Sequence, residues 1–163
     1  MQTDGIPETN VHAVTLSLGA NDIFPVLQNK YCTDDPEGEI CTRELEAATT
    51  TLEQNMDVIL GSLREAAGPE TIIMILTYYN PFDLGTGLAF ENVSDSTLDR
   101  LNQRIIRVAQ RHQAKVAGAN SIFVDLSPAL THVLAGDIHP TDEGCAALLL
   151  AFENSYEKAV PFQ

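Results

Sequence analysis

The chain has 163 residues, 44% of them hydrophobic, and a formal net charge of −14 at pH 7. This length and composition predict one globular domain with a buried core and exclude a largely disordered chain. Its 23 acidic against 9 basic residues argue against nucleic acid or an anionic membrane surface as a partner, because both would be repelled. Solubility, a salt-adapted source or cationic partners would each account for the charge.

The first half of the chain predicts two strands separated by a long helix. The apolar run 11–18 reads as a buried strand, and it breaks at Gly19. After a turn-rich loop, apolar residues at helical spacing predict a helix over 42–67, which ends at Gly68. Segment 71–79 is apolar on both faces, which favours a central parallel strand covered by helices on both sides.

The second half continues the alternation. Segment 80–93 is rich in Gly, Pro, Asp and Asn and is expected to be a long loop. A helix is predicted over 96–113, capped by its first serine, and a short third strand over 121–125. A turn of helix is expected within 127–134, and a last helix over 141–158, capped by its first threonine. This order is typical of an α/β fold with a parallel sheet.

No apolar run approaches the length that crosses a bilayer. Met1 is followed by Gln-Thr-Asp-Gly, which lacks the basic and apolar regions of a signal peptide. We therefore expect no transmembrane segment and no signal peptide in this chain.

The three cysteines bear on the cellular compartment in which the protein resides. Cys32 and Cys41 flank the acidic, turn-rich loop 33–39, and a disulfide between them would contribute about 2–3 kcal/mol. It would favour an extracellular or secreted protein, whereas two free thiols would suit a cytosolic one. Neither a Cys-x-x-Cys spacing nor a nearby histidine supports a metal site. Cys145 lies in the apolar last helix and is expected to pack in the core.

Two short stretches carry the residue types of an acyl-transfer site. The turn after the first strand offers the side-chain amide of Asn21, which can hold a developing oxyanion. His139, in the turn before the last helix, can carry a proton. Each has a simpler explanation: Asn21 would cap the following helix, and His139 would bond backbone groups beside Pro140.

These stretches resemble blocks of the SGNH (GDSL-type) ester hydrolase family. The run from Gly19 to Asp22 matches the family's Gly-x-Asn-Asp block, and His139-Pro140 partly matches its Asp-x-x-His-Pro block. The resemblance implies a three-layer, flavodoxin-like α/β fold and hydrolysis of carboxylic esters through a serine acyl-enzyme, with no metal or organic cofactor. It also implies oxyanion stabilisation by Asn21, aimed by the turn at Gly19, and a general base at His139.

The chain departs from the family at the acid and at the nucleophile. The family's carboxylate lies three residues before the histidine, where this chain has Gly136; Asp137 lies two before. We expect Asp137 either to orient His139 through an extended loop or to face solvent. The family's Gly-Asp-Ser block lies upstream of the Gly-x-Asn-Asp block, where only the unmatched segment 1–10 stands, without a serine. No serine shows a strained nucleophile elbow; the candidates are Ser17, Ser62, Ser94, Ser96, Ser121, Ser127 and Ser155.

The resemblance therefore implies a single domain over 1–163 that lacks the first strands of the fold. Segment 29–41 would be an insertion loop, in which some secreted members of the family carry a cysteine pair. Strand 11–18 would then lie at an open sheet edge, which predicts a homo-oligomer formed through that edge.

Three residues after the central strand are candidates for substrate binding. Tyr79, Asn80 and Phe82 follow this strand at the sheet edge where Gly19 and Asn21 also lie, and ligands of open α/β sheets bind there. Aromatic packing under the long loop is the alternative. The expected substrate is a small-molecule, lipid or sugar ester. The alternative function is a non-catalytic binding or self-association module. A nucleotide-binding flavodoxin-like domain would need a glycine-rich phosphate loop after its first strand, and this chain has no such loop there.

Overall fold

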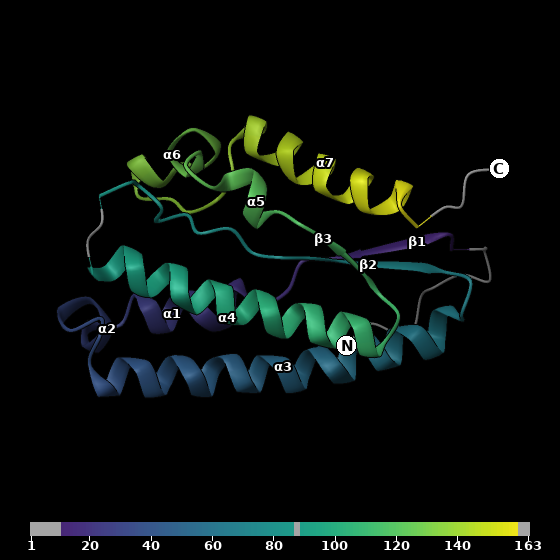
Figure 1. Cartoon of the computed structure of the whole chain (residues 1–163), viewed down its shortest axis with the longest axis horizontal. Coiled ribbons are helices and arrows are strands. Elements are labelled where there is room, and N and C mark those ends of the chain that lie inside the picture. Colours follow the sequence, from purple (N-terminus) through teal and green to yellow (C-terminus); the bar gives the residue numbers. More distant parts are fainter. Residues whose placement is uncertain (1–10, 87–88, 160–163) are drawn as a thin grey trace.

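The computed structural model describes residues 11–86 and 89–159 (Figure 1). Three parallel strands, β1 (Ala13–Leu16), β2 (Ile72–Leu76) and β3 (Lys115–Ala117), form a sheet in the order β1-β2-β3. The predicted parallel α/β fold is confirmed, and β1 is an edge strand of the described sheet. The unmatched segment 1–10 lies outside the described residues.

Helices cover both faces of this sheet (Figure 1). One layer holds α1, α2, α3 and α4, and the other holds α5, α6, the 3₁₀ helix η1 and α7. Their bounds are α1 Ala20–Leu27, α2 Lys30–Asp34, α3 Glu39–Ala67, α4 Ala89–Arg111, α5 Asn120–Phe123, α6 Ser127–Leu130, η1 Val133–Ala135 and α7 Asp142–Glu157. Among the residues that the structure describes, no helix is long and apolar enough to cross a bilayer.

The main core lies between the sheet and the α1–α3–α4 layer. The predicted stripe of α3 is buried through Leu45, Leu52 and Met56, which are spaced seven and four residues apart. Side chains alternate along β2, so Ile73 and Ile75 enter this core while Leu76 packs with Ala151 of α7 on the other face. Each large aliphatic side chain buried here contributes about 1.5–3 kcal/mol of transfer free energy.

The third strand is not where the sequence placed it. The sequence predicts a strand over 121–125, but helix α5 occupies most of this segment. The strand is β3, whose register with β2 runs from Met74↔Lys115 to Leu76↔Ala117. A tight turn at Gln113 (φ 54°) brings the chain from α4 directly into this register. Pairing with β2 thus outweighs the weak strand propensity of lysine and alanine.

Helix α4 also begins earlier than predicted, at Ala89 and not at 96. Ser96, predicted as the cap, lies inside the helix and donates its hydroxyl to the carbonyl of Val93 at 3.1 Å. Serine makes such local bonds both at caps and within helices, so its presence alone did not locate the start. The predicted loop 80–93 is correspondingly shorter.

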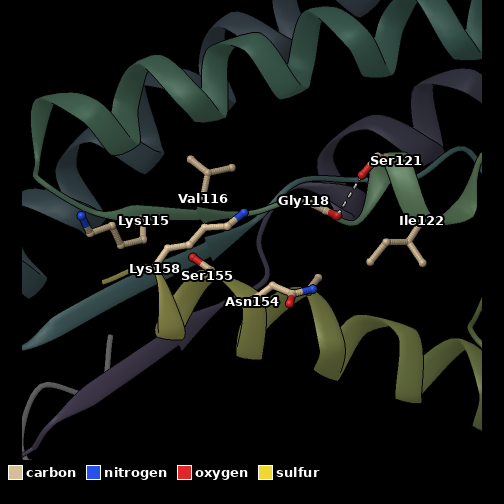
Figure 2. Close-up of a pocket in the computed structure, with 9 residues that line it drawn as sticks. Lys115, Val116, Gly118, Ser121, Ile122, Asn154, Ser155 and Lys158 are labelled. Carbon is tan, nitrogen blue, oxygen red and sulfur yellow. Dashed lines mark hydrogen bonds between the residues drawn. The ribbon is translucent and has the colours of Figure 1, made fainter. Parts of the chain in front are cut away.

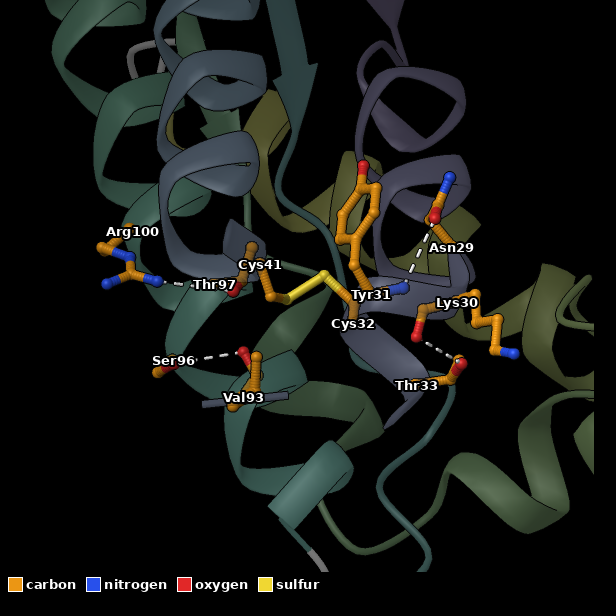
Figure 3. The surroundings of a disulfide bond; sticks show 10 residues. All are labelled: Asn29, Lys30, Tyr31, Cys32, Thr33, Cys41, Val93, Ser96, Thr97 and Arg100. Carbon is orange, nitrogen blue, oxygen red and sulfur yellow. Dashed lines mark hydrogen bonds between the residues drawn. A yellow bond between two sulfur atoms is a disulfide. The ribbon is translucent and has the colours of Figure 1, made fainter. Parts of the chain in front are cut away.

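The structure joins Cys32 and Cys41 by a disulfide, as predicted (Figure 3). The bond ties α2 to the first turn of α3, and both cysteines are buried. The predicted insertion loop 29–41 is therefore largely helical. The expectation for Cys145 is wrong, because this thiol is exposed. Helix α7 buries a narrow stripe of small residues, and its apolar residues outside that stripe, such as Leu149, remain open to solvent.

Candidate functional site

The turn after β1 depends on a glycine. Gly19 has φ 121°, and a Cβ at this position would lie 2.6 Å from a methyl carbon of Leu52 in α3. Its carbonyl accepts the N–H groups of Asp22 and Ile23 at 3.1 and 3.3 Å, which starts α1. Asn21 is thereby held in the first turn of α1 with its side chain exposed, at the carboxyl end of β1.

The loop that carries His139 is closed at its base. Thr131 and Pro140 form an antiparallel bridge, and the N–H of His132 donates to the carbonyl of His139 at 3.0 Å. Helices α6 and α7 cross immediately below it, where a Cβ on Gly144 would lie 2.0 Å from the carbonyl oxygen of Leu130. We call residues 131–140 the histidine loop.

Asp137 and His139 are in direct contact within this loop. Oδ1 of Asp137 lies 2.5 Å from Nδ1 of His139 and also accepts its backbone N–H at 3.0 Å. These bonds from His139 lower the pKa of the Asp137 carboxyl, so it stays ionised through neutral and mildly acidic solution. Both side chains are exposed. The one-residue offset from the family spacing therefore does not keep the carboxylate from the ring.

Two consecutive tyrosines after β2 reach towards opposite sides of the sheet. The hydroxyl of Tyr78 lies 3.4 Å from Oγ of Ser17, beside the Gly19 turn. The hydroxyl of Tyr79 donates to the carbonyl of Ile138 in the histidine loop at 3.5 Å. Burial raises the pKa of Tyr79 to about 12, so this hydroxyl keeps its proton. The pair thus links the end of β2 to both predicted parts of the site.

The ring of Tyr79 is also held in place by α5. It stacks on Phe123 of α5, with centroids 3.9 Å apart and planes 15° from parallel. On the other side of the strand, Asn102 of α4 accepts the N–H of Tyr78 and donates to its carbonyl, both at 2.7 Å. Neither Tyr78 nor Asn102 was predicted as part of the site, because nothing in their sequence spacing shows that they pair.

The other two candidates for substrate binding serve mainly to hold their own segment. Asn80 is buried; its Nδ2 donates to Asp95 at 2.7 Å and its Oδ1 accepts the N–H of Phe82 at 2.9 Å. Phe82 packs edge-to-face on Phe24 of α1, with centroids 6.0 Å apart. Asn80 also lines a pocket of about 400 Å³ with four aspartates, which are Asp83, Asp95, Asp99 and Asp125. Burial raises the pKa of Asp95.

No serine in the described parts of the chain hydrogen-bonds to the His139 ring, whose only described partner is Asp137. Ser127 is buried and donates to the carbonyl of Asn80, and Ser121 donates to that of Gly118. Across residues 11–86 and 89–159, no group of three or more His, Cys, Asp or Glu is arranged to hold a metal ion.

Comparisons with known proteins agree with this architecture. The model of the GDSL-like lipase/acylhydrolase family matches residues 2–147. A lipase from a goat rumen metagenome superposes with a TM-score of 0.71 at 18% identity, over 88% of this chain and 63% of the lipase. The extracellular lipase of Streptomyces rimosus gives 0.67 at 20% identity, over 88% and 68%.

A third solved structure, an acetylxylan esterase from Geobacillus stearothermophilus, gives a TM-score of 0.60 at 14% identity, over 94% of this chain and 61% of the esterase. Identities this low show a shared fold. The chain spans less than two thirds of the length of the goat-rumen lipase and of this esterase. The search among curated proteins gave no match.

Proposed function

Because the chain belongs to the GDSL-like lipase/acylhydrolase family, we propose that it takes part in the hydrolysis of carboxylic esters, with His139 as the proton acceptor. The observation that carries this proposal is the contact of Asp137 with Nδ1 of His139, in a loop at the carboxyl ends of the strands. Ligands of open α/β sheets bind at this edge. The carboxylate favours the tautomer with the proton on Nδ1, which leaves Nε2 as the basic nitrogen.

The chemistry needs a nucleophile, a base and oxyanion donors. In the proposed step, Nε2 of His139 takes a proton from a water molecule as its oxygen attacks the ester carbonyl carbon. The resulting oxyanion receives hydrogen bonds from the Asn21 amide and the Gly19 turn. When the carbonyl re-forms, the C–O bond to the alcohol breaks and the imidazolium returns the proton to the departing alkoxide. Water is assigned this role because no described serine contacts His139.

We assign small-molecule esters as the substrate class, bound near Tyr79, Asn80 and Phe82. The pocket lined by Asn80 and four aspartates favours a neutral or cationic alcohol part over an anionic one. The disulfide and the extracellular lipase with the same fold support secretion as the destination of the protein. We assign the whole of 1–163 to this one domain.

The test is hydrolysis of p-nitrophenyl acetate and p-nitrophenyl butyrate by the purified chain, from about pH 5 to about pH 8. The expected result is release of p-nitrophenol above the buffer rate. A rate equal to that of buffer at every pH would overturn the proposal.

The open edge of β1 favours self-association as a second function. In the described sheet β1 pairs with β2 alone, and Thr15 at its centre is exposed. Unpaired backbone groups along such an edge can pair with a second chain. We expect sedimentation velocity to show a dimer that Thr15→Lys dissociates, because a charge on an edge strand opposes pairing. A monomer at every protein concentration would contradict this.

A further inference from the structure

A second pocket lies on the outer edge of β3, apart from the histidine loop (Figure 2). Its volume is about 320 Å³, and it is enclosed by β3, the start of α5 and the last turns of α7. The polar residues that line it are Lys115, Ser121, Asn154, Ser155 and Lys158. None of the residues proposed above for ester hydrolysis lines this pocket.

The charge of this pocket is opposite to that of the chain. It is lined by two lysines and by no carboxylate, although the chain has 23 acidic and 9 basic residues. Neither Lys115 nor Lys158 forms an ion pair with any residue that the structure describes. By contrast, the pocket beside Asn80 is lined by four aspartates, and Arg104, Arg107 and Arg111 all pair with Glu53.

A serine hydroxyl also opens into the pocket. Ser155 is only 6% exposed, yet its Oγ is open to the solvent of the pocket, because no described hydrogen bond holds it and no buried side-chain oxygen of the described residues lacks a partner. Figure 2 shows this hydroxyl on the side of α7 that faces β3, next to the Lys158 side chain, which extends from the end of α7 across the strand. This hydroxyl can therefore donate a hydrogen bond to water or to a ligand in the pocket. The pocket thus presents a donor and positive charge together.

The end of α7 does not cancel this charge. A helix C-terminus carries about half a negative charge, whereas the two lysines carry two full positive charges. The Asn154 amide and the Ser121 hydroxyl add neutral donors at the rim. Carboxylate and phosphate oxygens accept such bonds, and bonds to ionised groups are roughly twice as strong as neutral ones.

We propose that this pocket binds a small oxyanion, held by the Lys158 ammonium and the Ser155 hydroxyl with Lys115 supplying further charge. The ligand class is a small free carboxylate or phosphate, for which the pocket of about 320 Å³ has ample room. The proposal is independent of ester hydrolysis, because no residue is shared between the two sites.

The experiment is a two-dimensional ¹H–¹⁵N NMR titration of the chain with sodium acetate and, separately, with sodium phosphate, against sodium chloride at matched ionic strength. Saturable shifts at the amides of Val116, Gly118 and Ser155 are expected with at least one of the two oxyanions and not with chloride. Saturation by acetate alone identifies a carboxylate site, and saturation by phosphate alone a phosphate site.

Variants distinguish a specific binding site from non-specific electrostatic attraction. Lys158→Gln should weaken binding about tenfold, the equivalent of one charge-assisted hydrogen bond, and Ser155→Ala should weaken it about threefold or more. Lys30→Gln is the matched control, because Lys30 is an exposed lysine of α2 outside the pocket. Shifts that never saturate, or an affinity unchanged in both Lys158→Gln and Ser155→Ala, would overturn the proposal.

Discussion

Replacing His139 by alanine is expected to lower p-nitrophenyl butyrate hydrolysis about a hundredfold, with little change in folding stability. General acid–base groups contribute about 10²–10⁴-fold, and we take the lower end because the Asp137–His139 pair is exposed and water-screened. The fold should tolerate the change because Asp137 is the only described hydrogen-bond partner of the ring, while the base of the histidine loop is held by backbone bonds. Initial rates and thermal unfolding of both proteins provide the measurement.

His112→Ala is the matched control. His112 is a part-buried histidine whose Nε2 lies 3.0 Å from Asp57 on α3, and it takes no part in the proposed site. Its loss should leave the hydrolysis rate unchanged. If His139→Ala and His112→Ala retain equal activity, His139 is not the base, and the catalytic assignment fails even though the family membership stands.

The second large effect is on stability. Asn102→Ala is expected to lower the free energy of unfolding by about 2–4 kcal/mol. Asn102 is buried, and its side chain satisfies both the N–H and the carbonyl of Tyr78 at 2.7 Å. Alanine would leave these two buried backbone groups without partners, each at a cost of about 1–3 kcal/mol, partly recovered if water enters. Urea unfolding followed by circular dichroism measures the difference.

Gln103→Ala on the same helix is the control, because Gln103 is exposed and its loss should change stability by less than about 0.5 kcal/mol. An Asn102→Ala protein as stable as Gln103→Ala would show that the clamp on Tyr78 contributes nothing. Since Tyr78 and Tyr79 are adjacent, a destabilised clamp should also broaden the NMR signals of Ile138 and His139.

The long elements could be predicted because their signals are repeated along the chain. The stripe of α3 recurs over about five turns, and Thr141 caps α7 by accepting the N–H of Gly144, as its position before an apolar run predicts. The short β3 could not be predicted in this way. Three residues of weak strand propensity become a strand only because β2 is beside them.

The residues of the candidate site also divide into those with a local sequence pattern and those whose role depends on distant contacts. Asn21, Asp137 and His139 were identifiable because each stands in a short local pattern. The contributions of Tyr78, Tyr79 and Asn102 depend on pairs separated by 24 to 61 positions, which a single sequence does not reveal. The position of Ser155 opposite the β3 edge is likewise a product of how α7 packs on the sheet.

The closed base of the histidine loop also bears on how this fold diversifies. The N–H of Thr141 donates to the carbonyl of Leu130 at 2.9 Å, and the Thr131–Pro140 bridge lies just above that bond. The ends of the loop are thus fixed to each other before it reaches Leu134, which is 77% exposed. Residues between 133 and 136 can therefore be inserted, removed or exchanged without moving either flanking helix, so the rim of the site can change its shape in evolution or by engineering while the scaffold beneath is inherited intact.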